Sequence, residues 1–454
     1  MVPYRHLRTG QCRNASFALK LSGVLLNALR AVPTEPSFSR KGVNSLKYVI
    51  IGNSAAAVGA VEAIRKNDSE GRIVIISNET HHTYSRPLIS YLLLGKTDEN
   101  RMKYRGDSFY SDNKCEFLPG KTVQRIDPEK KQVLLDDGSC ESYDKLLIAT
   151  GSTPFIPPVK GLEKVRNKFT FTTLDDARKL DSALIEGSRV LILGAGLIGL
   201  KCAEGISKKK VSTVCVDLSH RVLSSILDDE ASEIVKKHLE KNNIRFYLGQ
   251  QVTEFSDGSA MLDDGTEIPF DVLVTAVGVR PNISLLKDIG GKTNRGIIID
   301  ERCRTSIPDI YAAGDCCECR DAASGEMKVM ALLPNAYMQG ECAGMNMSGA
   351  DCVFDKAIPM NAIGLFGKHI ITAGVYTGEV YLETDGENYK KLFYSNNRLN
   401  GFILIGNIEK AGIYTSLIRE GTPLDSIDFE LICRMPGLMA FSREERARIL
   451  SGIA

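Results

Sequence analysis

The sequence predicts an α/β protein with two strand–turn–helix–strand units and a smaller α+β domain after them. Two apolar runs lead into Gly52 and Gly194. Each glycine begins a turn of small residues, and a helical segment follows. Further short apolar runs with turn residues between them follow residue 355. Parallel sheets need strands that alternate with helices, whereas antiparallel sheets are built from short strands joined by tight turns.

Composition and charge exclude several classes of protein. The 454 residues are 43% hydrophobic and 25% charged, which argues against a mainly disordered, fibrous or multi-span membrane protein. The formal net charge of +1 gives no electrostatic reason to expect nucleic acid as a partner. The 12 cysteines are scattered, which favours reduced thiols and a cytoplasmic location over a secreted disulfide scaffold.

The first 46 residues differ from the rest and form an extension. Residues 1–43 hold many bases and a single acid, Glu35, and no apolar run approaches the roughly 18–20 residues of a membrane span. Such an Arg-rich, acid-poor composition is typical of an organelle transit peptide. The alternative is an upstream extension from a misplaced start, with synthesis beginning near Val43.

The first unit begins with the apolar run 48–51, which enters the turn Gly52-Asn53-Ser54-Ala55-Ala56-Ala57 and a helical segment. A second run, 73–76, ends shortly before Glu79. This is the order of a Rossmann dinucleotide-binding unit, where small residues let the backbone approach a pyrophosphate and the acid binds ribose hydroxyls. Because the turn is G-x-S-x-x-A, an ordinary βα turn remains an alternative for this unit taken alone.

The second unit has the complete pattern. The run 190–193 leads into Gly194-Ala195-Gly196-Leu197-Ile198-Gly199, a helical segment, a second run at 213–216 and then Asp217. All three glycines and the acid lie in the order that a dinucleotide requires.

The residues at the end of this unit bear on the choice of nucleotide. The charge of Asp217 favours NADH because it repels the 2′-phosphate of NADPH. His220 and Arg221 follow directly, and they either soften this preference, which leaves NADPH possible, or are solvated turn residues.

Three later apolar runs end in Thr-Gly, Val-Gly and Gly-Asp, at 146–151, 273–278 and 310–315. The carboxylate of Asp315 suits a polyol such as the ribityl chain of FAD.

Taken together, these motifs and the segment Tyr84-Ser85-Arg86-Pro87-Leu88 resemble the FAD-dependent pyridine nucleotide-disulfide oxidoreductase superfamily. The resemblance runs from Lys47 to Asp355. Within the superfamily it is to the branch of rubredoxin reductase and the flavin portion of NAD(P)H nitrite reductase.

The resemblance implies an FAD domain made of residues 47–158 and 283–354, with an NAD(P) domain, 159–282, inserted in it. A C-terminal interface domain, 355–454, would cover the flavin and contribute to subunit or acceptor contacts. Inside that domain the sequence predicts strands at 375–376, 380–381, 391–394 and 399–406 and a helix at 411–418.

The resemblance also implies the residues that bind the two cofactors. The expected FAD residues are Gly52, Ser54 and Ala55 at the pyrophosphate, Glu79 at the adenosine ribose, Val123 at the adenine, Asp315 at the ribityl hydroxyls, and Asn335 and Ala336 at the flavin. Thr150, Gly151 and Gly278 are expected beside the cofactors, and Gly194, Gly196, Leu197, Ile198, Gly199 and Asp217 at NADH. A helix beginning at Pro334 would direct its positive end at the flavin and stabilise negative charge on the reduced ring.

Departures from the family pattern exclude part of its chemistry. The stretch from His82 to Gly95 contains no cysteine, so a thiol–disulfide relay and cysteine-dependent peroxide reduction would lack their nucleophile. Arg86 is expected beside the isoalloxazine, where relatives have Lys; the alternative is a helix-surface arginine. Lys201 occupies a position where the family often has Glu, so the usual Lys–Glu pair is missing, and only Glu204, one turn on, is placed to compensate partly.

The cysteines Cys316, Cys317, Cys319 and Cys342 lack the C-x₂-C steps of zinc and iron–sulfur sites, so no metal is predicted. The function that these observations favour is an FAD-containing NAD(P)H:acceptor oxidoreductase. It would pass hydride from NADH to flavin and electrons to a separate acceptor such as rubredoxin or another iron–sulfur protein, and the resemblance implies a homodimer. The alternatives are an NADH oxidase, a quinone or small-molecule reductase, and an FAD- and NADH-binding redox sensor.

Overall fold

A computed structural model of the chain describes residues 45–451, so the predicted extension lies almost wholly outside the described residues. Of these residues, 45–422 form one compact unit, and 423–451 belong to a second. No helix in the described part of the chain is long and apolar enough to cross a membrane.

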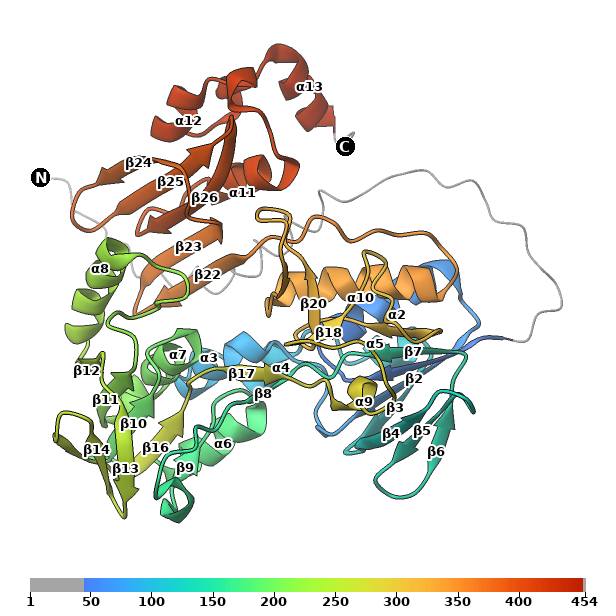
Figure 1. Cartoon of the computed structure of the whole chain (residues 1–454), viewed down its shortest axis with the longest axis horizontal. Coiled ribbons are helices and arrows are strands. Elements are labelled where there is room, and N and C mark those ends of the chain that lie inside the picture. The colour runs from blue at the N-terminus through green and yellow to red at the C-terminus, as the bar shows by residue number, and fades with distance from the viewer. Residues whose placement is uncertain (1–44, 452–454) are drawn as a thin grey trace, which may run out of the picture. The chain divides into compact units, whose positions relative to one another are not determined.

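The first parallel sheet joins segments that are far apart in the sequence (Figure 1). Its strands, in spatial order, are β19 (Ile310–Ala312), β7 (Lys145–Ile148), β1 (Lys47–Ile51), β2 (Arg72–Ser77) and β3 (Cys115–Pro119). Two helices, α2 (Ala55–Asn67) and α10 (Leu333–Met347), lie against each other over this sheet. Their close approach requires glycine, since a Cβ on Gly340 would lie 1.9 Å from the Ala56 carbonyl oxygen.

The second parallel sheet repeats this arrangement. Its strands, in spatial order, are β12 (Ile244–Leu248), β11 (Ser212–Asp217), β10 (Arg189–Leu193), β16 (Val272–Thr275) and β9 (Lys168–Phe169). Its helices are α6 (Leu174–Ala183), α7 (Leu197–Ile206) and α8 (Asp229–Glu240). The chain enters this sheet after β8 (Ser152–Pro154) and leaves it at β17 (Val279–Pro281), and these two strands pair antiparallel.

Before the chain adds the next strand of each parallel sheet, it forms a separate three-stranded antiparallel sheet. In the first unit it consists of β4 (Val123–Asp127), β5 (Gln132–Leu135) and β6 (Cys140–Ser142). In the second unit it consists of β13 (Val252–Ser256), β14 (Ser259–Leu262) and β15 (Glu267–Pro269). The two strand–turn–helix–strand units therefore share a five-stranded parallel sheet and an inserted antiparallel sheet.

The C-terminal sheet is antiparallel, and its side chains share a hydrophobic core with those of α7 and α8. Its strands, in spatial order, are β22 (Met360–Leu365), β23 (Lys368–Gly374), β26 (Arg398–Ile405), β25 (Tyr389–Ser395) and β24 (Glu379–Thr384), and α11 (Ala411–Glu420) follows them. The prediction of a strand at 375–376 is wrong. Strand β23 ends at Gly374, whose φ of +74° turns the chain where a Cβ would lie 2.0 Å from the Asn400 carbonyl oxygen.

Shorter elements complete the fold: α3 (Ile89–Leu93), α4 (Glu99–Met102), α5 (Phe109–Asp112), α9 (Ser284–Lys287), β18 (Ile297–Ile298), β20 (Cys317–Arg320) and β21 (Met327–Val329). The second compact unit contains α12 (Phe429–Arg434) and α13 (Arg443–Ser451). The predicted α/β class, with two Rossmann-like units and a small C-terminal domain, is confirmed.

Candidate dinucleotide sites

The turn between β1 and α2 depends on a glycine. Gly52 has a φ of +119°, and a Cβ there would lie 2.1 Å from the Ala149 carbonyl oxygen. Ser54 is the N-cap of α2, and its hydroxyl makes no capping hydrogen bond. The hydroxyl and the first backbone N–H groups of the helix are thus suited to bind an anion.

The turn between β10 and α7 has the same form. Gly194 has a φ of +105°, and a Cβ there would lie 2.4 Å from the Ala276 carbonyl oxygen. A Cβ on Gly199 would lie 2.0 Å from the Gly194 carbonyl oxygen, so this glycine allows the helix to pack on the turn. Gly196, in contrast, has no atom within 4 Å of its Cβ position, and the open space there is where a pyrophosphate would approach.

Open space also lies at the ends of the strands that flank the two turns. Gly151 and Gly278 have φ values of +64° and +111°, and neither has an atom within 4 Å of its Cβ position. Near Gly151, the Thr150 hydroxyl donates to the Asn282 carbonyl oxygen over 3.0 Å. These residues leave backbone exposed where a dinucleotide would lie, so the chain fits one dinucleotide at each unit.

The acid of the second unit lies against its own turn. One oxygen of Asp217 accepts from the Ala195 N–H over 2.6 Å, and the other accepts from the Ser219 N–H over 2.7 Å. The carboxylate is thereby fixed at the end of β11, beside the N-terminus of α7, where the sequence predicts the ribose of NADH.

The acid of the first unit has different partners. Glu79 accepts from the Tyr84 hydroxyl over 2.6 Å and forms an ion pair with Arg86. Burial works against the charge of Arg86, but Tyr84 and Glu79 outweigh it, and the pKa of Arg86 is raised. The structure thus brings together two residues that the resemblance assigns to different parts of FAD, and both assignments stay predictions.

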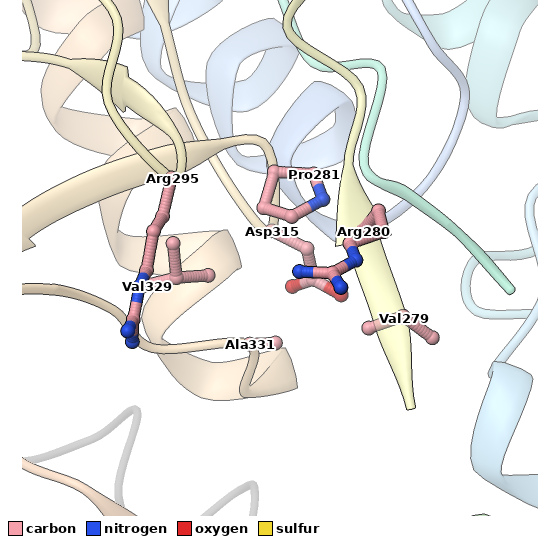
Figure 2. Close-up of a pocket in the computed structure, with 7 residues that line it drawn as sticks. All are labelled: Val279, Arg280, Pro281, Arg295, Asp315, Val329 and Ala331. Atoms are coloured by element: carbon pink, nitrogen blue, oxygen red, sulfur yellow. The ribbon is translucent and has the colours of Figure 1, made fainter. Parts of the chain in front are cut away.

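Asp315 lines a pocket of about 420 Å³ (Figure 2). Burial raises the pKa of this carboxyl group, and the positive charge of Arg86 opposes the rise. The other lining residues are Val279, Arg280, Pro281, Arg295, Val329 and Ala331. Sequence reasoning missed Arg280 and Arg295, because no motif connects them to Asp315; β17 and the segment before β18 bring them to the pocket.

Lys201 contacts the acid that the sequence places one turn on, and also an aromatic ring and a backbone carbonyl that the sequence did not assign to it. It forms an ion pair with Glu204, whose side chain is 4% exposed, and its Nζ lies 4.3 Å from the ring centroid of Tyr91. Its Nζ also donates to the Gly364 carbonyl oxygen over 3.1 Å. Lys201 thus pairs with Glu204 one turn on within α7, and its contacts connect α7 to α3 and to β22.

The remaining predicted residues take defined places. Val123 is buried at the start of β4, opposite Leu135. Asn335 and Ala336 lie in the first turn of α10, both buried, and the Asn335 amide donates to the Ile358 carbonyl oxygen over 3.4 Å. The Gln339 side chain accepts from the Gly314 N–H over 2.7 Å and so connects α10 to the Gly-Asp turn before Asp315.

The cysteines after Asp315 are buried. The sulfur atoms of Cys316 and Cys317 lie 3.6 Å apart. Among residues 45–451, no three His, Cys, Asp or Glu side chains are arranged to hold a metal ion.

Comparisons with known proteins agree with this geometry. The family model described as pyridine nucleotide-disulphide oxidoreductase matches residues 46–340, and the model of the rubredoxin NAD+ reductase C-terminal domain matches residues 359–422. The NADH-dependent phenylglyoxylate dehydrogenase subunit epsilon of Aromatoleum evansii is 32% identical over 397 residues, which are 85% of this chain and 94% of that protein. The crystal structure of the ferredoxin reductase for the CYP199A2 system of Rhodopseudomonas palustris superposes with a TM-score of 0.78 at 25% identity, covering 83% of this chain and 95% of that one.

A longer relative is also similar. Nitrite reductase [NAD(P)H] of Bacillus subtilis is 30% identical over 387 residues, which are 82% of this chain and 47% of that protein. The chain thus spans about half the length of this relative. The predicted family, its FAD and NADH cofactors and an oxidoreductase activity are confirmed by these matches. This chain belongs to the pyridine nucleotide-disulphide oxidoreductase family.

Proposed function

We propose that this protein oxidises NADH through bound FAD and delivers the electrons to a separate protein acceptor, rubredoxin or another iron–sulfur protein. The observation that supports this most is the presence of two dinucleotide turns in one chain with no cysteine between His82 and Gly95. Without a thiolate in that stretch, electrons would leave the flavin directly and not through a disulfide.

The chain supplies binding and orientation. The N-terminus of α2 with Ser54 would hold the pyrophosphate of FAD, and the N-terminus of α7 that of NADH. Asp315 would accept from the ribityl hydroxyls, and Asp217 from the ribose of NADH. When bound, FAD takes up a hydride from NADH and gives up its electrons one or two at a time.

Two positively charged side chains would act on the cofactors or on the helix that binds them, and each is paired with a carboxylate. Arg86, with Glu79, would place positive charge near the flavin, where it favours negative charge on the ring. Lys201, with Glu204, would hold α7 against α3 and so orient the nucleotide that α7 binds.

Two findings favour a protein acceptor. The C-terminal part of the chain matches the domain named for rubredoxin NAD+ reductase, and one similar structure is a ferredoxin reductase. The chemistry of the longer nitrite reductase is not part of this proposal, because the match covers about half of that protein.

The proposal is tested on the purified protein in two steps. Anaerobic addition of NADH should bleach the flavin absorption at about 450 nm. Rubredoxin, ferricyanide, menadione and oxygen are then compared as oxidants, and rubredoxin should restore the absorption fastest among them. Protein without flavin, or flavin that NADH leaves unbleached, would contradict the proposal. Fastest reoxidation by oxygen or menadione would favour the oxidase or small-molecule alternative, and slow reoxidation by all of them would favour the sensor.

The role of Arg86 has its own test. Arg86→Ala should lower the two-electron potential of the bound flavin by about 30 mV or more, equivalent to about 1.4 kcal/mol, since it removes positive charge. The potential is measured against dyes under anaerobic conditions. Arg105→Ala, which breaks another half-buried Arg–Glu pair in the same unit, serves as the control and should leave the potential in place. An unchanged potential in the Arg86 variant would place this arginine away from the flavin.

The oligomeric state and location are part of the same proposal. We infer a homodimer in the cytoplasm, on the family resemblance and on the scattered cysteines of the chain. Light scattering on the purified protein measures the oligomeric state directly.

A further inference from the structure

We propose that Asp229 is a positioning residue for nucleotide specificity. It would hold His220 and Arg221 away from the 2′ position of the nucleotide, so that Asp217 alone decides in favour of NADH. The inference rests on the proposed function, which assigns the Gly194–Gly199 turn to that nucleotide.

His220 and Arg221 lie near Asp217 in the sequence, in the loop that joins β11 to α8. Asp217 is the last residue of β11, and its carboxylate is bonded to the N–H of Ser219. His220 and Arg221 follow at once in the same loop. An arginine close to this carboxylate is what accommodates a 2′-phosphate in NADP-binding Rossmann units.

In this protein both side chains are bound to the same carboxylate oxygen of Asp229. Arg221 Nη1 donates to Asp229 Oδ1 over 2.7 Å, and His220 Nε2 lies 3.2 Å from the same oxygen. Arg221 also donates through Nη2 to the Ser224 carbonyl oxygen over 3.4 Å. Of the three side chains, that of Arg221 is the least exposed, at 29%, so it is the more firmly held cation.

The position of Asp229 is fixed by its neighbours on either side. It is the first residue of α8, and the N-cap residue Asp228 accepts from the Ala231 N–H over 3.0 Å. Lys391 of β25 forms a 2.8 Å ion pair with Asp228, and the Tyr389 hydroxyl donates to Glu230 over 2.9 Å. The start of α8 is therefore anchored to the C-terminal sheet. Because Asp229 lies between two anchored residues, its backbone is held in place when the loop after β11 moves.

This arrangement disfavours NADPH in two ways. A 2′-phosphate would meet the charge of Asp217, and the guanidinium of Arg221, which could neutralise the phosphate, is already paired with Asp229. Removing the charge of Asp229 would free Arg221, whose guanidinium binds phosphate oxygens well. The C-terminal sheet would thus influence nucleotide choice without touching the nucleotide.

The experiment compares Asp229→Asn with the wild-type protein. The ratio of kcat/KM for NADPH to that for NADH should rise about threefold to fivefold, as expected for release of an exposed ion pair. Affinity for 2′,5′-ADP, measured by calorimetry, should rise by a similar factor while affinity for NAD+ stays within about twofold. Glu233→Gln removes one charge from the same helix, where Glu233 pairs with the neighbouring Lys236 and Lys237, and it should leave both ratios unchanged.

A double variant identifies the freed cation. Asp229→Asn combined with Arg221→Gln should return the ratios to the wild-type values. Unchanged ratios in the single variant, or an equal rise in Glu233→Gln, would overturn the inference. If the wild-type protein bound neither NAD+ nor NADH, the proposed function itself would fail, and this inference would fail with it.

Discussion

In the second dinucleotide unit, the carboxylate of Asp217 bonds to the backbone of its own glycine turn, whereas in the first unit Glu79 pairs with Arg86 and Tyr84. The backbones of the two turns are nevertheless alike. The Gly52 N–H donates to the Ile76 carbonyl oxygen and the Gly194 N–H to that of Val216, both over 2.8 Å. A repeated strand–turn–helix–strand pattern therefore reproduces the turn, while the partners of the acid depend on the loop that follows the acid.

The helices after the two turns differ in the same way. Glu62 and Glu204 lie at equivalent positions, five residues after the last small residue of each turn. Glu62 pairs with Arg105 and accepts from the Tyr337 hydroxyl, while Glu204 pairs with Lys201 and accepts from the Phe366 N–H. Each unit therefore uses a carboxylate, partly buried at Glu62 and buried at Glu204, to hold its helix, but the partner segments are unrelated.

The largest expected effect comes from disabling one turn at a time. Gly52→Ala should abolish FAD retention, and Gly194→Ala should leave FAD bound but slow its reduction by NADH at least about 100-fold, because each Cβ would collide with a backbone carbonyl. Flavin content is measured by absorbance and reduction by anaerobic stopped flow. Gly187→Ala, at another glycine of positive φ but with nothing within 4 Å of its Cβ position, controls for backbone strain. Loss of flavin from the Gly194 variant would show that the two sites are not separable.

A smaller effect is expected at Lys201. Lys201→Glu would place a second carboxylate beside the buried Glu204, which costs about 3 kcal/mol of stability, and should also slow the reduction of flavin by NADH. Lys201→Arg should retain most of both properties. Denaturant unfolding and stopped flow measure the two effects, and Lys66→Glu, in an exposed pair on α2, is the control. A destabilised variant with an unchanged reduction rate would make Lys201 a structural residue only.

The smallest effect concerns the acids that directly precede β7 and β16. The backbone N–H of Lys47 donates to Asp144, and that of Arg189 donates to Asp271. Only Arg189 adds a guanidinium, and this, with its backbone N–H, lowers the pKa of Asp271 to about 2.

This difference gives a pH prediction with a definite sign. Because the folded-state pKa of Asp271 lies below the usual value of about 3.9, its contribution to stability is present above about pH 4. The contribution disappears as the pH falls from about 4 to 2. Asp271→Asn should therefore lower the stability slightly at neutral pH and flatten its loss in acid, which thermal unfolding between pH 6 and 2 measures. An identical acid dependence in the variant and the wild-type protein would contradict the assignment.

The two turns, the class of fold and the family could be predicted from the residues alone. A turn with positive φ and a backbone carbonyl close by requires glycine, which locates Gly52 and Gly194. The spacing from the second turn to the end of the next strand then locates Asp217. The pairing of charged side chains, in contrast, depends on the tertiary structure. The ion pairs Glu79–Arg86 and Asp229–Arg221 each join separate loops or elements, and Arg280 and Asp315 come from different elements to line one pocket. Such pairs depend on packing between segments, which no local pattern of residues encodes.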